Sequence, residues 1–462
     1  MSAANLAAGA PHLAEPALAR LLAARSMRES RPRSPQLHLI EHEDGAQLLV
    51  ANGSRLYALG AAQRDALRAA LARGDEAALA RQLAAAGLQA PPAIDDTPLA
   101  PMAPHALSLA IAQKCNLGCT YCYAQQGSFG GAATAMTQDV ATLAVDRLLD
   151  GAAPGARVNL AFMGGEPLSN RPVLRAATTY AAARAAQRGV AIGFSVTTNG
   201  TLLRPDDADF FEQHGFAVTV SLDGLPAQHD RLRPFKNGKG SFERVMAGVA
   251  PLLARQRRMQ VSARITVTPF NLDLAASLDA FIGMGFHSVG FSPLLRAPNG
   301  EDELGPERLE QMLEAMIACG LAFERHVLRG ERYPFLNMVT ALRELQRGTH
   351  RPYPCGAGAG YFGVAADGAV SACHRFVGDP DGQFGTLADG IDRGRQAIWL
   401  AQRHVHTQQP CGGCWARYLC GGGCHHEVLA RGRQACDYIR GWLHYTIGAH
   451  GRLGRLAPGA FD

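Results

Sequence analysis

KCNLGCTYC, residues 114–122, is the segment from which the architecture of this chain can be worked out, because it places Cys115, Cys119 and Cys122 in the spacing C-x3-C-x2-C. Three thiolates supply three of the four ligands that a cubane [4Fe–4S] cluster needs, so one iron stays free for a small molecule. Zinc is the alternative, since Cys-x2-Cys pairs also bind zinc, but this spacing without a nearby histidine fits zinc poorly. The segment therefore predicts an iron–sulfur cluster with an open coordination position.

The bulk composition bounds the class of protein. The chain has 462 residues, of which 47% are hydrophobic and 18% charged, which is typical of a globular protein with two or three domains. A net charge of +5 does not indicate nucleic acid. The Ala- and Arg-rich N-terminus is interrupted by Pro11, Glu15 and Pro16, so it lacks a signal-peptide core; a transit peptide is a weaker alternative. We expect a cytoplasmic protein with reduced, metal-bound thiols and no membrane or nucleic-acid partner.

Residues 105–330 alternate between strand and helix patterns, which predicts a parallel α/β sheet closed into a partial barrel of six βα units. In such barrels the reactive groups lie on loops at the C-terminal ends of the strands. The expected strands cover residues 107–111, 158–163, 192–198, 217–222, 261–268 and 288–294.

The rest of the chain divides around this barrel. Residues 1–35 are an N-terminal extension, and 36–88 form a small α+β module with three strands, a turn at 43–45 and two helices that end near Gly74 and Gly87. A Pro-rich linker covers 89–104. Residues 331–354 form a bridging region, 355–436 a cysteine-rich domain, and 437–462 a C-terminal helix and tail.

Polar motifs follow the strands of the predicted barrel. Gly164-Gly165-Glu166-Pro167 comes after the second strand, where glycine allows close backbone approach to a ligand and Glu166 can accept a hydrogen bond from an ammonium group. Arg264 lies inside an apolar strand and therefore needs a buried anion. The set is completed by Thr198 and Asn199 after the third strand and by Ser221 and Asp223 after the fourth.

The cysteine segment, with Tyr121 before its last cysteine, and the Gly164–Pro167 motif resemble the radical S-adenosylmethionine (SAM) enzymes. This resemblance implies that the free iron binds the amino and carboxylate groups of SAM, and that SAM is split into methionine and a 5′-deoxyadenosyl radical. It also implies that SAM is contacted by Tyr121, Gly164, Gly165, Glu166, Pro167, Thr198, Asn199, Ser221, Asp223 and Arg264. Within this set, Arg264 is the expected partner of the SAM carboxylate, because a guanidinium fork matches that group. For each polar residue taken alone, a structural hydrogen bond is an equal alternative. The basic stretch 229–242 is either solvated surface or a substrate-facing lid.

Seven further cysteines between residues 355 and 436 resemble the SPASM domain, which carries up to two auxiliary iron–sulfur clusters. The resemblance implies that Cys355, Cys373 and Cys424 hold the first auxiliary cluster and that Cys411, Cys414, Cys420 and Cys436 hold the second, for three [4Fe–4S] clusters in all. Two structural zinc sites are the alternative. Cys319, in a helical run, is most simply a small buried hydrophobe.

Residues around the auxiliary cysteines narrow the resemblance. Sulfatase-maturing relatives carry Asp directly after the second SPASM cysteine, where this chain has His374. Three motifs, Trp415–Tyr418, Gly422–Glu427 and Ala435–Trp442, are similar to the thioether-forming branch that matures quinohemoprotein amine dehydrogenase. That branch joins Cys sulfurs to methylene carbons of Asp or Glu in the small dehydrogenase subunit. His374 and Glu427 are the candidate proton acceptors.

The implied partners are a peptide or small protein that is rich in Cys and Asp/Glu, with or without a leader, and an electron donor such as flavodoxin or ferredoxin. The N-terminal module either binds that leader by strand addition or only caps the barrel. Two alternatives remain: a maturase that forms other thioether or carbon–carbon (cyclophane) links, and a zinc-binding regulatory protein without enzymatic activity.

Overall fold

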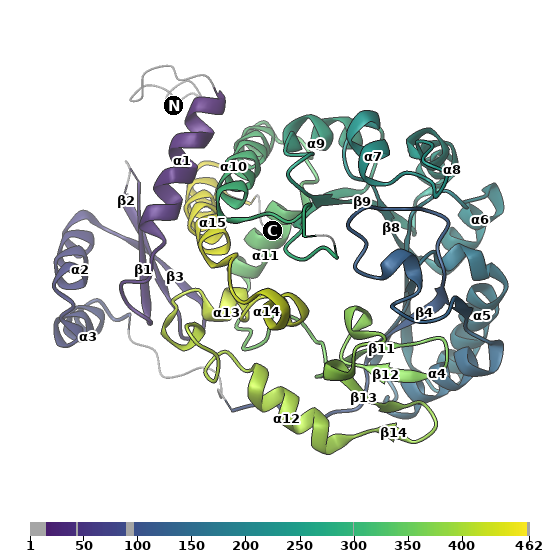
Figure 1. Ribbon diagram of the computed structural model, residues 1–462. Coiled ribbons are helices and arrows are strands. Elements are labelled where there is room, and N and C mark those ends of the chain that lie inside the picture. Colours follow the sequence, from purple (N-terminus) through teal and green to yellow (C-terminus); the bar gives the residue numbers. More distant parts are fainter. Residues whose placement is uncertain (1–14, 43–44, 89–96, 299, 460–462) are drawn as a thin grey trace.

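The computed structural model describes residues 15–42, 45–88, 97–298 and 300–459. Figure 1 shows a small N-terminal module beside a bundle of long helices, then the barrel, with the cysteine-rich C-terminal region packed below both. The turn residues Glu43 and Asp44 and the first half of the expected linker, 89–96, lie outside the described residues. No described helix has both the length and the apolar character needed to cross a membrane.

Six parallel strands form the central sheet in the spatial order β10-β9-β8-β7-β6-β4. They coincide with the six predicted strands to within a few residues, and β6, β8 and β9 carry the period-two alternation of a strand. In β9, for example, Val261, Ala263 and Ile265 are buried, whereas Arg264 between them is exposed to the barrel interior. The bounds are β4 (Ala106–Gln113), β6 (Arg157–Gly164), β7 (Ala191–Thr198), β8 (Ala217–Ser221), β9 (Gln260–Val267) and β10 (Ser288–Pro293).

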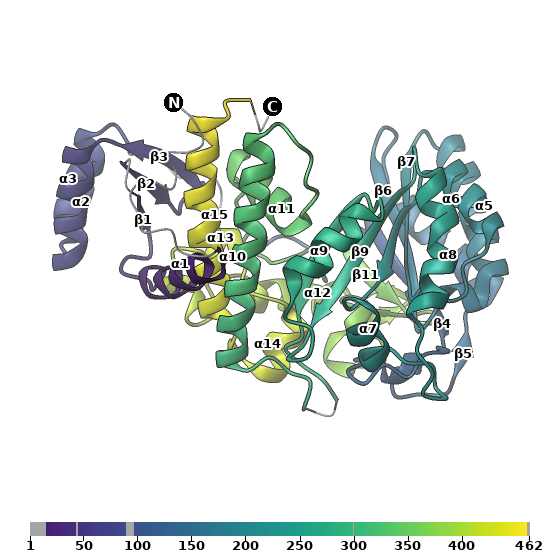
Figure 2. The ribbon, with the colours of Figure 1, turned by 90° about the horizontal axis from the view of Figure 1, so that it is seen from above.

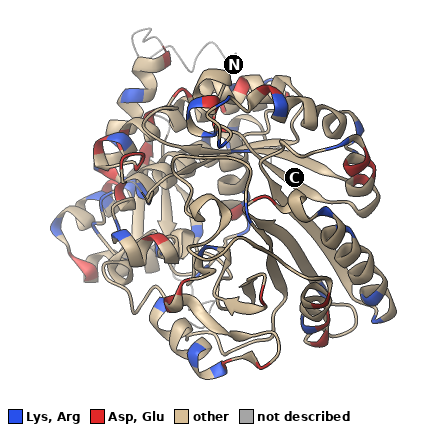
Figure 3. Cartoon of the chain, turned by 45° about the vertical axis from the view of Figure 1, so that its right-hand side comes forward, with Lys and Arg blue, Asp and Glu red and all other residues tan. Residues whose placement is uncertain are grey.

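Helices cover the outer face of this sheet (Figure 2). Helix α8 (Phe242–Arg255) is typical: Val245, Val249 and Leu252 recur at helical spacing and are completely buried, so one stripe faces the strands. Figure 3 marks both basic and acidic positions along the outer helices. The other covering helices are α4 (Gln138–Asp150), α5 (Arg171–Gln187), α6 (Pro205–His214), α7 (Pro226–Leu232) and α9 (Leu274–Gly283).

A seventh parallel strand comes from the cysteine-rich region. β11 (Tyr361–Val364) pairs with β4 on the side opposite β6, and it continues into antiparallel β12 (Ala369–Ser371), β13 (Gln383–Thr386) and β14 (Gly390–Ile391). The short β5 (Thr134–Ala135) also pairs with β4. The barrel and the cysteine-rich region therefore share one continuous sheet. The domain boundaries expected near residues 331 and 355 did not anticipate this pairing.

The remaining C-terminal chain is mostly helical. Long helices α10 (Pro306–Leu328) and α15 (Cys436–Leu456) pack against each other, and Cys319 is completely buried at that contact, in agreement with its expected role as a hydrophobe. Between them lie α11 (Leu336–Gln346), α12 (Arg393–Arg403), α13 (Arg417–Cys420) and α14 (His425–Arg431), with short 3-10 turns at η4 (His374–Phe376), η5 (Pro380–Gly382) and η6 (Cys411–Gly413).

The N-terminal module contains three strands and two helices, and an additional helix precedes it. Strands β1 (Leu37–His42), β2 (Gly45–Val50) and β3 (Arg55–Leu59) form an antiparallel sheet, followed by α2 (Ala61–Arg73) and α3 (Glu76–Ala85). Gly74 ends α2 in the left-handed conformation, with φ of 63°. Helix α1 (Glu15–Glu29), inside the expected N-terminal extension, packs against α10 and α15 and so ties the start of the chain to its end.

Candidate active site

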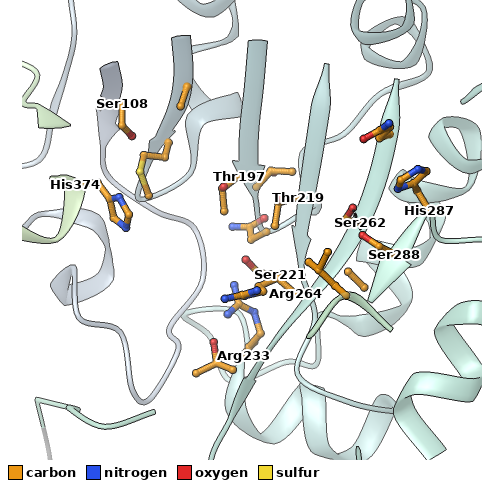
Figure 4. A pocket seen from close by; sticks show the side chains of 18 of the residues that line it. Ser108, Thr197, Thr219, Ser221, Arg233, Ser262, Arg264, His287, Ser288 and His374 are labelled. Carbon is orange, nitrogen blue, oxygen red and sulfur yellow. Dashed lines mark hydrogen bonds between the residues drawn. The ribbon is translucent and has the colours of Figure 1, made fainter. Parts of the chain in front are cut away.

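A cavity of about 1100 Å³ opens inside the barrel (Figure 4). Its walls carry small hydroxyl side chains on the inner faces of successive strands, among them Thr197, Thr219, Ser221, Ser262 and Ser288. Closed barrels usually fill this space with bulky branched residues. The small polar residues at the inward positions instead leave room for a ligand that forms hydrogen bonds.

The three predicted cluster cysteines line one end of this cavity. Their loop is held by the 232–235 segment: Gly118 N–H donates to the Pro234 carbonyl at 2.8 Å, and Thr120 N–H donates to the Leu232 carbonyl at 3.3 Å. Part of the basic stretch 229–242 therefore supports the cysteine loop. Residues 236–240 of that stretch are exposed, whereas His229 is completely buried.

The surroundings of these thiols fit the predicted cluster. Burial raises the pKa of Cys115, and that of Cys119 to about 12, so without a metal both side chains stay protonated. Coordination to a metal deprotonates a thiol outright. The Leu117 N–H and the Asn199 side-chain amide donate to the Cys115 sulfur at 3.5 and 3.6 Å, and such donors stabilise a thiolate. No three His, Cys, Asp or Glu side chains in the described parts of the chain converge as ligands of a single metal ion.

Gly164 and Gly165 are required by the protein's own backbone. A Cβ atom on Gly164 would lie 2.3 Å from the Ala112 carbonyl oxygen, and one on Gly165 would lie 2.3 Å from that of Lys114. Gly165 N–H donates to Ala112 and Glu166 N–H donates to Lys114, at 2.8 and 2.9 Å. These glycines thus press the end of β6 against the start of the cysteine loop. Both residues also line the cavity.

Glu166 is completely buried and is not among the residues that line the cavity. Its carboxylate accepts hydrogen bonds from Leu168 N–H at 3.0 Å, Thr198 Oγ1 at 2.8 Å and Asn199 N–H at 2.8 Å. Burial raises the pKa of this carboxyl, and the three donors oppose that rise. Glu166 joins the ends of β6 and β7, and Pro167 beside it is also buried. Contact between either side chain and SAM stays a prediction.

Tyr121, Asp223 and Arg233 form a buried network behind the cysteine loop. Arg233 Nη1 donates to the Tyr121 hydroxyl at 2.6 Å and lies 3.5 Å from Asp223 Oδ2, which also accepts from the Tyr121 hydroxyl. Thr266 N–H donates to Asp223 Oδ1 at 2.9 Å. Asp223 is completely buried, whereas Tyr121 and Arg233 line the cavity. The network orients Arg233 toward the site. Arg233 belongs to the stretch 229–242, which the sequence analysis interpreted only as a lid or as solvated surface.

Four other expected SAM contacts also line the cavity. Thr198, Asn199 and Ser221 line it from the ends of β7 and β8. Ser221 is the strand neighbour of Arg264 in the pairing of β8 with β9, so both side chains face the cavity. The structure therefore brings together all the predicted SAM residues except Glu166, Pro167 and Asp223, which lie one layer behind the wall.

The seven C-terminal cysteines fold into two groups. Burial raises the pKa of Cys373 to about 12, and the neighbouring Cys355 and Cys424 add to the rise. Burial likewise raises the pKa of Cys420 to about 11, and there the neighbours are Cys411, Cys436 and Cys414. These are the two groups that the SPASM resemblance implied, although the roles as cluster ligands stay a prediction.

Three consecutive glycines separate the two groups. Gly421, Gly422 and Gly423 have φ of 69°, 95° and 80°, a backbone path that other residues rarely adopt. The turn they make lets Cys420 and Cys424 point to different groups. A Cβ on Gly421 would also lie 2.4 Å from the backbone of Pro354, which precedes Cys355.

The two candidate proton acceptors are placed differently. His374 lines the cavity, with Nδ1 at 2.7 Å from the Tyr361 hydroxyl. Glu427 does not line it and accepts a hydrogen bond from Arg375 Nη1 at 2.8 Å. Arg375, which sequence reasoning did not single out, lines the cavity and lies over the Tyr123 ring at 5.2 Å from the ring centre. The feature of the sequence that could have identified Arg375 as a site residue is its position directly after His374.

Comparison with known proteins agrees with this site. Residues 109–280 match the Radical SAM superfamily. The serine-type anaerobic sulfatase-maturating enzyme of Klebsiella aerogenes is 27% identical over 350 residues, which cover 72% of this chain and 83% of that enzyme. The cysteine-type anaerobic sulfatase-maturating enzyme of Clostridium novyi is 28% identical over 285 residues, 58% of this chain and 72% of that enzyme.

Solved structures show the same fold. Native anSMEcpe with bound AdoMet and Cp18Cys peptide superposes with a TM-score of 0.61 at 20% identity, over 76% of this chain and 99% of that chain. Streptococcus suis SuiB bound to precursor peptide SuiA superposes with a TM-score of 0.52 at 13% identity, over 86% and 96%. The predicted fold class, a partial barrel with a radical SAM domain and a cysteine-rich C-terminal region, is confirmed.

Proposed function

From the radical SAM domain at residues 109–280, we propose that this chain is a radical SAM/SPASM maturase that modifies a peptide or small protein. One observation carries the proposal: a single cavity of about 1100 Å³ is lined both by the three-cysteine loop and by His374 and Arg375 beside the first auxiliary group. Small-molecule pockets measure about 300–1,000 Å³. The cavity therefore has room for SAM together with part of a second molecule.

The cofactors follow from the donor atoms. Cys115, Cys119 and Cys122 hold the SAM-binding [4Fe–4S] cluster, and the two C-terminal groups hold the auxiliary clusters. When bound, this cluster and SAM together supply a 5′-deoxyadenosyl radical that removes a hydrogen atom from the substrate. Ser221 and Asn199 offer hydrogen bonds to SAM at the cavity wall, and Arg233 offers a cation.

The finer proposal is thioether formation between a Cys sulfur and a methylene carbon of Asp or Glu, as in the small subunit of quinohemoprotein amine dehydrogenase. One C–H and one S–H bond are replaced by a C–S bond, so each link removes two hydrogens. The hydrogen atom leaves with the adenosyl group, the thiol proton goes to a base, and one electron passes to the auxiliary clusters. His374 suits the base better than Glu427, because His374 faces the cavity and Glu427 is paired with Arg375.

The proposed partners use other surfaces. β1 and β3 are the edges of the three-stranded N-terminal sheet, and an edge strand can pair with an extended leader peptide. Flavodoxin or ferredoxin is the proposed electron donor. A maturase that forms other thioether or carbon–carbon links, or that acts on a sulfatase, is the second candidate, favoured by the identity to sulfatase-maturating enzymes.

Mass spectrometry tests the proposal. The anaerobic enzyme is incubated with SAM, a strong reductant and the small dehydrogenase subunit, and the product is treated with a thiol-alkylating reagent. We expect a loss of two hydrogens per link and cysteines that no longer react. Hydrogen loss with every thiol still reactive would indicate carbon–carbon links, and 5′-deoxyadenosine release without product would contradict only the substrate.

The control is the triple variant Cys115→Ala/Cys119→Ala/Cys122→Ala. It should lose SAM cleavage and keep the auxiliary clusters, whose cysteines form separate groups. Retained cleavage would contradict the site assignment. A colourless anaerobic preparation that contains zinc would favour the regulatory alternative, because iron–sulfur proteins are brown.

A further inference from the structure

Arg264 occupies the cavity wall without an acidic partner. It lies in the middle of β9, between the buried Ala263 and Ile265, so its side chain faces the barrel interior. Its guanidinium donates to the Ser292 hydroxyl on β10, and among the described residues no carboxylate lies within ion-pair distance of it. A guanidinium enclosed by protein is costly unless an anion compensates it.

Two other arginines of the cavity wall are compensated by carboxylates. Arg233 is paired with Asp223, and Arg375 is paired with Glu427 at 2.8 Å. Burial lowers the pKa of Arg264, and the like charge of Arg375 lowers it further. The wall at Arg264 thus carries a positive charge that the protein itself does not neutralise.

The position of Arg264 indicates which anion it binds. Arg233 contacts Tyr121 of the cysteine loop, where the carboxylate of SAM is expected. Besides Ser292, the groups that act on the charge of Arg264 are Arg375 and Tyr438, both from the C-terminal region. Arg264 also borders a smaller hollow that is lined by Trp442 of α15. Gly290 on β10 leaves space beside it, since a Cβ there would lie 3.2 Å from Arg264 Nη1. Arg264 therefore lies between the two cysteine regions, with its planar fork accessible from the cavity.

We propose that Arg264 binds a carboxylate of the peptide substrate, from an acidic side chain, at a position distinct from the carboxylate of SAM. The fork of a guanidinium matches a carboxylate with two parallel hydrogen bonds. The proposal rests on the proposed function, because it supposes a peptide in this cavity. It replaces the sequence-based expectation that Arg264 binds the carboxylate of SAM.

Binding measurements test this assignment without relying on turnover. Two fluorescein-labelled peptides are used, one with a single Cys and a single Glu and a twin with Gln in place of Glu. Their affinities for the anaerobic, SAM-bound holoenzyme are compared by fluorescence anisotropy, and the affinity for SAM is measured separately. The variants are Arg264→Gln, Arg264→Lys as a charge-preserving check, and Arg343→Gln as a control that removes an arginine from the same cavity on α11.

We expect the unchanged enzyme and the Arg343→Gln control to prefer the Glu peptide by about ten- to hundredfold, the usual effect of a charge-assisted hydrogen bond. Arg264→Gln should abolish the preference for the Glu peptide and leave the affinity for SAM within about twofold of that of the unchanged enzyme. Arg264→Lys should keep part of the preference for the Glu peptide. Equal binding of both peptides to the unchanged enzyme, or a loss of SAM affinity in Arg264→Gln with the Glu preference intact, would overturn the proposal. A Glu preference without any crosslinked product would contradict the proposed function alone.

Discussion

Asp223 shows how a single buried carboxylate organises the candidate site. It is completely buried, and it accepts hydrogen bonds from Tyr121 on the cysteine loop, Thr266 on β9 and Arg233 on the supporting segment. Burial raises its pKa, while the positive charge of Arg233 and these hydrogen bonds oppose the rise. Three separate pieces of chain therefore meet at this carboxylate.

The substitution Asp223→Asn should destabilise the protein by about 3 kcal/mol, because the Arg233 guanidinium would then be buried without its counter-charge. The free energy of unfolding, measured by chemical denaturation under anaerobic conditions, checks this expectation. The same variant should bind SAM more weakly, since Arg233 and Tyr121 lose their common partner.

A surface carboxylate provides the matched control. Asp209 pairs with Arg255 at 2.8 Å, but the two side chains are 67% and 45% exposed. Asp209→Asn should therefore change the free energy of unfolding by less than about 1 kcal/mol. Equal effects of the two substitutions would show that the buried pair contributes no more than a surface pair.

At the scale of elements, a histidine pair joins the N-terminal module to the C-terminal helix. His38 on β1 stacks on Trp415, with ring centres 3.8 Å apart, and its Nε2 lies 2.9 Å from His444 Nδ1 on α15. Trp415 Nε1 donates to the Ser30 carbonyl at 2.8 Å, directly after α1. These contacts place the end of α1, β1 and α15 around the segment that carries Cys414.

This joint should make stability fall in acid. Burial lowers the pKa of His38, and that of His444 to about 4, whereas both titrate near 6.5 in the unfolded chain. Below about pH 6.5 the unfolded state therefore binds more protons, and stability is lost as the pH falls.

Between pH 6.5 and 5.5 each histidine should contribute a loss of about 1 kcal/mol. Unfolding free energies of the unchanged protein and of the double variant His38→Gln/His444→Gln, measured at both pH values, test this. The double variant should lose about 2 kcal/mol less than the unchanged protein over that interval. Identical pH dependence in the two proteins would show that the pair does not titrate as proposed.

At the scale of the whole molecule, the pairing of β11 with β4 makes the barrel and the cysteine-rich region one folding unit. Four residue pairs join the strands, Tyr361 to Val364 with Ala106 to Leu109. A chain that ends at residue 354 would expose this edge of β4, and an unpaired apolar edge is a site of aggregation. We expect that truncated chain to elute as aggregates in anaerobic gel filtration.

A chain that ends at residue 456, after α15, is the control and should elute like the full chain. Monomeric elution of the 1–354 chain, with the colour of a bound cluster, would contradict the view that the barrel requires β11. The experiment therefore tests whether the domain boundary expected near residue 355 from the sequence is also a boundary between parts that fold independently.

Local sequence patterns alone determined much of this protein. The six parallel strands follow from apolar alternation, which depends only on neighbouring residues, and the confirmed radical SAM domain follows from the spacing of three cysteines within one loop and the motif one strand later. The two helix ends at Gly74 and Gly87 also follow from local chemistry.

Only the tertiary structure decided which distant groups meet. It assigned the Glu166 carboxylate to Thr198 and the neighbouring backbone, paired Arg233 with Asp223, left Arg264 without a protein anion, and placed β11 beside β4. Such partners lie from ten to more than two hundred residues apart. Their meeting depends on how whole helices and strands pack, and packing depends on the shapes and charges of all elements together, which no local pattern contains.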